Sequence, residues 1–174
     1  MRKEQKANYP ESARGAAALL VRMVLEDGAY TNIALNQYLR GSRLSDLDRR
    51  LATELVYGTV KASGTLDWYL AQCVSRPLDK VAGDILAILR ISTYQLLYMT
   101  RIPASAAVNE AVKLARSVSH EGSAKFVNGV LRGLLRKQEA GAFVLPDAEK
   151  QDADYLSLKY YHPRWLVKRW LGPW

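Results

Sequence analysis

The segment from about Val81 to Met99 constrains the fold more than any other part of the chain. It is apolar on nearly every side and contains no proline, so its length and composition predict a helix. Arg90, Ser92 and Gln95 make it too polar to span a bilayer, and it is also too short. Because a helix that is apolar all round must be surrounded by other elements, we expect it at the centre of a helical bundle.

Helical periodicity and capping residues predict further helices on both sides of this central segment. Ser12 can cap a helix that ends at Asp27 with Gly28 behind it, and Thr31 and Ser45 are candidate caps for the next two helices. The remaining predicted helices cover about 66–73, 106–118 and 123–136. Since no part of the chain has a strand-rich pattern, we predict an all-α bundle of about seven helices.

The ends of the chain differ in composition from this helical domain, which we place at residues 12–137. Residues 1–11 are polar and predict a flexible arm, and residues 138–152 predict a linker. Residues 153–174 predict an extra C-terminal helical segment that is split at His162-Pro163.

Three of the four tryptophans, Trp165, Trp170 and Trp174, lie in the last ten residues. Two of them, Trp165 and Trp170, form with Leu166, Val167 and Leu171 an apolar stripe that needs a surface to pack on. The chain stops on Trp174 without a polar ending, as we expect where a longer protein has been cut.

The charge of the chain favours a polyanionic partner. Its 174 residues include 25 Lys and Arg against 17 Asp and Glu, a net charge of +8 and a pI near 9.6. Nucleic acid is the first candidate, and an acidic protein or a membrane surface is the second. A basic surface that is merely solvated remains the alternative.

Three basic residues are the candidate phosphate contacts. On the first predicted helix, Arg14 and Arg22 lie opposite the apolar stripe and roughly 80° apart, so we expect both on one outer face. Guanidinium groups bind phosphate through paired donors. Lys125 opens the last helix of the domain, and Arg132 and Arg136 follow along it.

The sequence offers little for catalysis, cofactor binding or metal binding. The single cysteine, Cys73, has no histidine near it in sequence, and the two histidines have no metal-ligand spacing with it. No glycine-rich turn follows a strand, and Gly129 and Gly133 are expected to allow close approach of a neighbouring helix. We therefore predict no catalytic, cofactor-binding or metal-binding residue, and we expect the cytoplasm because no signal peptide is visible.

Two asparagines, Asn109 and Asn128, interrupt otherwise apolar helical segments. Asparagine is unfavourable inside a helix, so each needs a reason. Contact with a base is one interpretation. The flanking apolar residues favour the other, a buried amide that satisfies a neighbouring helix end or loop.

Two stretches carry a family likeness: IPASAAVNEAVKLA at 102–115 and KFVNGVLR at 125–132. They resemble the signature of NusB-like RNA-binding domains. The segments 89–97 and 13–17 are similar to the helix before that signature and to the start of the family's first helix. The likeness covers about residues 12–137 and implies a NusB-like helical bundle.

A narrower likeness rests on GTLDWYL at 64–70, YMTRIP at 98–103 and HPRWLVKRW at 162–170. These resemble the Sun/Fmu family of small-subunit ribosomal RNA cytosine-C5 methyltransferases. In that family a NusB-like domain precedes a domain that uses S-adenosylmethionine, and no part of that second domain is present here.

The resemblance implies an RNA-binding domain that docks such an enzyme on ribosomal RNA. It assigns RNA contact to Arg14 and Arg22 on the first helix and, less directly, to Lys125. The alternative is a NusB-type transcription antitermination factor that binds RNA with a ribosomal protein. A third alternative is a protein–protein scaffold with an incidental basic face.

Overall fold

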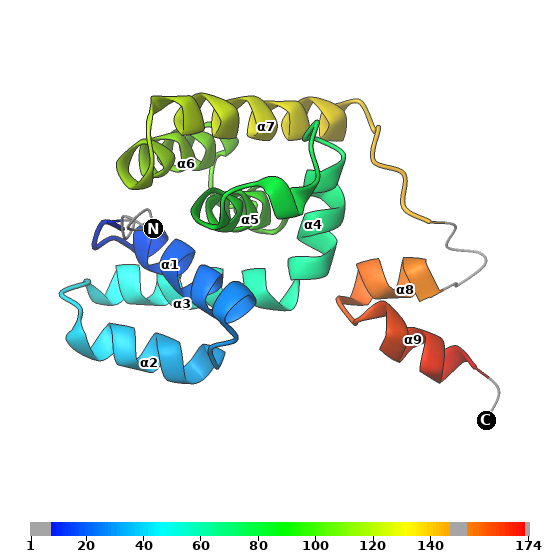
Figure 1. Cartoon of the computed structure of the whole chain (residues 1–174), viewed down its shortest axis with the longest axis horizontal. Coiled ribbons are helices and arrows are strands. Elements are labelled where there is room, and N and C mark those ends of the chain that lie inside the picture. The colour runs from blue at the N-terminus through cyan, green and yellow to red at the C-terminus, as the bar shows by residue number, and fades with distance from the viewer. Residues whose placement is uncertain (1–7, 147–152, 173–174) are drawn as a thin grey trace, which may run out of the picture.

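Helices make up the ordered architecture of the chain (Figure 1). The structure, a computed structural model, describes residues 8–146 and 153–172. The helices that precede the predicted linker are α1 (Ala13–Asp27), α2 (Thr31–Gly41), α3 (Asp46–Lys61), α4 (Ser63–Ala71), the short 3₁₀ helix η1 (Leu78–Lys80), α5 (Gly83–Tyr98), α6 (Ala104–Val118) and α7 (Glu121–Glu139). Two more follow it, α8 (Ala153–Tyr160) and α9 (Arg164–Leu171). The described residues contain no strand, so the all-α prediction is confirmed.

Helix α5 lies at the centre of the bundle, as its composition predicts. It packs against α1, α3, α4, α6 and α7, and Ile88, Leu89 and Ile91 are almost completely buried. Two buried polar side chains of α5 bond to their own helix: the Ser92 hydroxyl donates to the Ile88 carbonyl and the Gln95 amide to the Ile91 carbonyl. These bonds satisfy polar groups that would otherwise be costly to bury.

The capping residues determine where two of the helices begin. The Ser12 hydroxyl accepts a hydrogen bond from the Gly15 amide at 3.0 Å, and the Ser45 hydroxyl accepts one from the Asp48 amide at 3.2 Å. Gly28 ends α1 with a left-handed φ of 73°. Thr31 differs from the prediction, because it is the first residue of α2 and the cap position before it makes no side-chain hydrogen bond.

The close helix approach occurs at Gly58 and not at Gly129 or Gly133. A Cβ atom at Gly58 would collide with the ring of Tyr94 on α5. At Gly129 it would meet open space, and at Gly133 it would meet only the Arg136 side chain at 3.7 Å. The prediction for Gly129 and Gly133 is therefore wrong, because their side of α7 faces away from the neighbouring helices.

Within the predicted arm, Tyr9 packs against the bundle before α1 begins. Residues 1–7 lie outside the described residues, but Tyr9 packs against the main core and its hydroxyl donates to Asp84 on α5. Burial is the main cause that raises the pKa of Tyr9, and Asp84 raises it further. Packed structure thus reaches beyond Ser12 toward the N-terminus.

The predicted linker is bracketed by packed residues. α7 continues to Glu139, and Phe143 then packs edge-on against Tyr69 of α4 with ring centroids 4.8 Å apart. Residues 147–152 of the predicted linker lie outside the described residues.

The C-terminal segment forms the two predicted helices, separated at His162-Pro163. The Thr65 hydroxyl of α4 donates to the Leu158 carbonyl of α8 at 2.7 Å. Tyr161, which follows α8 with a φ of 61°, packs its ring edge-on to Tyr98 of α5. These contacts hold the segment beside α4 (Figure 1).

None of the helices within residues 8–146 and 153–172 is both long enough and apolar enough to cross a membrane.

Candidate nucleic-acid interface

Arg14 lies in the first turn of α1 and is anchored to the central helix. Its Nε donates to the side-chain oxygen of Gln95 at 2.9 Å, and Gln95 itself is 1% exposed. The arginine is half-buried. This bond uses Nε, so the position of the guanidinium is fixed by α5 while its terminal amino groups have no described bond.

Arg22, two turns further along α1, is held by two carboxylates. Its Nη1 lies 2.5 Å from Asp84 of α5, and its Nε lies 3.2 Å from Glu26 on its own helix. Burial alone would lower the pKa of Arg22, but the charges and hydrogen bonds of Asp84 and Glu26 raise it. Its side chain keeps 36% exposure.

Both arginines therefore point to the side of α1 that packs on α5. The expectation of an outer basic face on α1 is not met, because small apolar residues such as Ala16, Ala17 and Ala18 bury this helix on several sides. The helical spacing correctly places the arginines on one side. That side lies along the seam with α5 and is only partly exposed.

Lys125 is exposed near the start of α7. Its described electrostatic neighbour is Glu121, whose carboxylate also accepts a hydrogen bond from Arg116 at 2.6 Å. The bond from Arg116 is the main cause that lowers the pKa of Glu121. Since Arg14 and Arg22 are only partly exposed, Lys125 is the most accessible of the three predicted contacts.

A hollow of about 330 Å³ at the start of α7 escaped the sequence reasoning. It lies between the starts of α5 and α7, and Arg76, Lys80, His120 and Phe126 are among its lining residues. The Arg76 guanidinium lies 4.7 Å from the centre of the Phe126 ring, a cation–π contact. Arg76 precedes Pro77 in a loop and Lys80 ends the short helix η1, so no periodic pattern indicates which way their side chains point.

His120 and Ser123 fix the start of α7 at this hollow. The His120 ring accepts a hydrogen bond from the Ser123 amide at 3.2 Å and so caps the helix. Free amides at a helix start favour anions. Cations and a helix start therefore meet at one place on the surface.

The two asparagines do not fill the predicted role. Asn109 is exposed on α6. Asn128 is half-buried, and its side-chain oxygen accepts from Arg132 Nε at 2.9 Å. Neither described arrangement satisfies a helix end or a loop, so the prediction of buried amides is wrong. The two asparagines of the family-like stretches thus lie at or near the surface.

Cys73 has the environment of an unreactive thiol. Burial raises its pKa, although Lys137 opposes the shift. Its Sγ lies 3.4 Å from the Tyr69 carbonyl oxygen. A nucleophilic cysteine needs a lowered pKa. Among residues 8–146 and 153–172, no group of three His, Cys, Asp or Glu side chains is placed to hold a metal ion.

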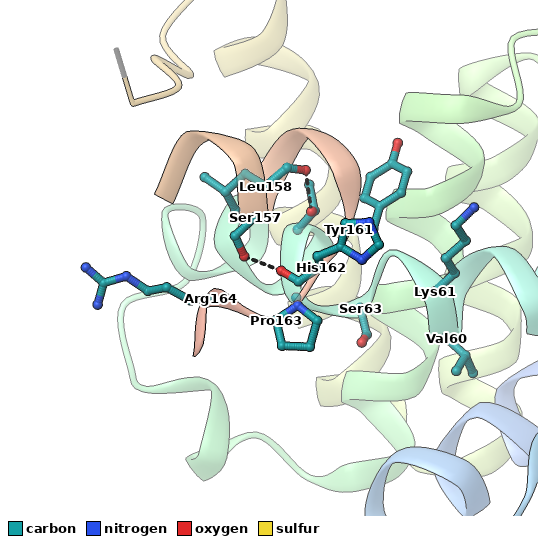
Figure 2. Close-up of a pocket in the computed structure, with 11 residues that line it drawn as sticks. Val60, Lys61, Ser63, Ser157, Leu158, Tyr161, His162, Pro163 and Arg164 are labelled. Atoms are coloured by element: carbon teal, nitrogen blue, oxygen red, sulfur yellow. Dashed lines mark hydrogen bonds between the residues drawn. The ribbon is translucent and has the colours of Figure 1, made fainter. Parts of the chain in front are cut away.

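A second hollow, of about 460 Å³, lies where α4 meets the C-terminal helices (Figure 2). Ser63 and Thr65 contribute from α4, and Tyr161 and His162 from the turn between α8 and α9. The Ser157 hydroxyl donates to the His162 carbonyl at 2.5 Å, which closes that turn. The other hydrogen bond drawn there, from the Thr65 hydroxyl to the Leu158 carbonyl, joins α4 to α8. The hollow therefore marks the junction between the bundle and the C-terminal helices.

The fold defines the class of protein. The structure of NusB from T. maritima matches with a TM-score of 0.66 and 21% identity, over 77% of this chain and 98% of that one. A chain in the crystal structure of a plectonemic RNA supercoil matches with a TM-score of 0.69 and 19% identity, over 74% and 95% of the two chains. At such identities the likeness establishes the NusB-like fold alone.

Residues 11–136 match the NusB family, and the chain belongs to that family. It is 40% identical over 94% of its length to the probable ribosomal RNA small subunit methyltransferase B of Synechocystis sp.. It is 37% identical over 91% of its length to the protein of that name in Bacillus subtilis. The matches cover 36% and 34% of those two proteins, so the chain spans about a third of the length of these curated relatives.

Proposed function

We propose that the chain is the RNA-binding domain of a small-subunit ribosomal RNA cytosine-C5 methyltransferase and that it docks the enzyme on ribosomal RNA. Relatives of that name match at 37% to 40% identity, and the chain carries a net charge of +8. Because ribosomal RNA is the proposed partner, the proposed location is the cytoplasm.

The extent of the match carries this proposal. A match over 94% of the chain must include most of the residues after Arg136, where the NusB family match ends. The solved NusB structure covers only 77% of the chain. The match must therefore include α8, which lies beyond the NusB family match, and this favours an enzyme part over a free-standing NusB protein.

S-adenosylmethionine would be the cofactor of the longer enzyme. Residues 8–146 and 153–172 do not fit that group, because they contain no strand with a glycine-rich turn leading into a helix. We therefore assign methyl transfer to a further domain, and binding and orientation of RNA to this one.

Geometry ranks the three proposed RNA contacts. Lys125 is exposed and comes first. Arg14 comes second, because Gln95 holds its Nε and leaves its terminal amino groups for a phosphate. Arg22 comes last, since a phosphate would have to compete with Asp84 and Glu26.

A NusB-type antitermination factor is the second candidate function. A solved complex of NusB and NusE with double-stranded RNA has a TM-score of 0.66 to this chain. A regulator of that kind would bind a ribosomal protein through the bundle and would not need α8 and α9.

Titration with RNA tests the proposed function. We expect the 174-residue chain to bind a fluorescent 20-nucleotide single-stranded RNA with a Kd on the order of micromolar, measured by anisotropy between 50 and 300 mM KCl. Arg14→Gln with Lys125→Gln should weaken binding and reduce the slope of log K against log salt by about 1.4, or about 0.7 for each phosphate contact.

The matched control is Arg50→Gln with Lys61→Gln on α3, two exposed residues without a described ion pair. It removes the same charge and should leave the slope unchanged. Arg22→Gln should mainly lower the melting temperature. Absence of binding by the parent chain would contradict the proposal and leave the scaffold alternative.

A further inference from the structure

The outer face of α7 carries a row of cations. Arg132 and Arg136 follow Lys125 by seven and eleven residues, which places all three within about 20° of one line and spreads them over roughly 16 Å. All three are exposed, while Val127, Leu131 and Leu134 bury the opposite side of the helix. Gly129 also faces outward, so no side chain interrupts the row.

None of these three cations has a described ion pair, whereas six other cations of the described structure do. Arg22, Arg90, Arg101, Lys113, Arg116 and Arg164 all contact carboxylates within 4 Å. Arg132 instead bonds to Asn128 through Nε, which orients its guanidinium and leaves the terminal amino groups. The acidic residues of α7, Glu121 and Glu139, stand at its two ends, and Arg116 already binds Glu121.

The composition of this face favours a polyphosphate over a protein surface. Protein interfaces need buried apolar anchors at their centre. Of the large apolar side chains that the structure shows exposed, none belongs to α7; they include Tyr57, Trp165 and Leu171 on other helices. A face with cations and without anchors gains binding energy from phosphates through release of counterions.

We propose that Lys125, Arg132 and Arg136 form a phosphate-binding track along which an RNA strand runs, from the hollow at the start of α7 toward its C-terminal end. This rests on the proposed RNA-binding function and deepens it. The track makes α7 the main RNA-contacting helix, and Arg14 and Arg22 on α1 become secondary.

The test uses Arg132→Gln with Arg136→Gln, which removes two charges and keeps good helix formers. The control Arg50→Gln with Lys61→Gln removes the same charge from α3. With the 20-nucleotide RNA, the α7 variant should lose about 1.4 from the salt slope and about 25-fold in affinity at 0.1 M KCl. The control should stay within twofold, and circular dichroism should show that both variants are folded.

Each outcome decides between the alternatives. Equal losses in the two variants would mean that only total charge matters, and an unchanged α7 variant would mean that RNA runs elsewhere; either overturns the track. If the chain binds polyglutamate of equal charge more tightly than RNA, the face serves an acidic protein and the track is also overturned. If the parent chain binds no RNA, the proposed function itself fails, whereas the first two outcomes overturn the track and leave that function intact.

Discussion

The bundle from α1 to α7 and the C-terminal pair α8–α9 are both helical, but they are stabilised in different ways. Most helices of the bundle have 15 to 19 residues, and their buried faces form a shared core around α5. Helices α8 and α9 have eight residues each, and no residue of α8 is buried. In α9, Val167 is 2% exposed, while Trp165 is 65% and Leu171 is 53% exposed.

The long bundle helices are stabilised by a shared core, whereas the short C-terminal helices are too short to be stable through their own hydrogen bonds. An eight-residue helix is marginal by itself in water, because too few hydrogen bonds offset the cost of starting it. The C-terminal pair therefore depends on its contacts with α4 and α5, chiefly the bond from Thr65 and the edge-on ring contact between Tyr161 and Tyr98. Its exposed apolar side chains are typical of a surface that another part of a protein covers.

The largest expected effect is loss of a core leucine. Leu131→Ala on α7 should destabilise the bundle by about 2–5 kcal/mol, because it removes a completely buried side chain and leaves a cavity. Leu171→Ala on α9 is the matched change at an exposed site and should cost less than about 0.5 kcal/mol. Urea unfolding followed by circular dichroism measures both. Similar losses of unfolding free energy in the two variants would show that the bundle and the C-terminal pair form one cooperative unit. That result would contradict the difference in stabilisation described above.

An intermediate effect is expected from tight packing within the bundle. Gly58→Ala should cost about 1–3 kcal/mol, because the added methyl group meets the Tyr94 ring. Gly129→Ala, where a Cβ meets open space, should stabilise α7 by about 0.5–1 kcal/mol. Thermal unfolding of the pair gives the sign of each change. Stabilisation by Gly58→Ala would mean that α3 and α5 are less closely packed than the structure shows.

The smallest effect concerns the bond that joins the two regions. Thr65→Val removes the donor to the Leu158 carbonyl and should weaken docking of α8 by about 1 kcal/mol. Amide exchange in α8 should then speed up about fivefold, while exchange in α5 stays unchanged. Ser63→Ala, which removes a hydroxyl with no described bond on the same helix, is the control. Faster exchange in both helices would argue against separate docking of the C-terminal pair.

The candidate interface was only partly accessible to sequence reasoning. Lys125 was found because it follows a loop at the start of a predicted helix, and it is exposed. Arg14 and Arg22 were correctly placed on one side of α1, but the identity of their partners, Gln95 and Asp84, depends on how α1 packs against α5. These partners lie 81 and 62 residues away in the chain, beyond any local pattern.

The amino-acid sequence by itself determined the elements that local physics controls. Ser12, Gly28 and Ser45 delimit helices because their caps form within a few residues, and the apolar composition of α5 requires a central position. Family resemblance supplied the arrangement of the bundle.

Only the tertiary structure decided which polar groups remain available to a partner. It tied Arg22 to Asp84, left Asn109 exposed and located the close helix approach at Gly58. Helical periodicity gives the angle between two side chains on one helix. The neighbour that each side chain meets is set by the packing of distant segments, which minimises exposed apolar surface over the whole molecule.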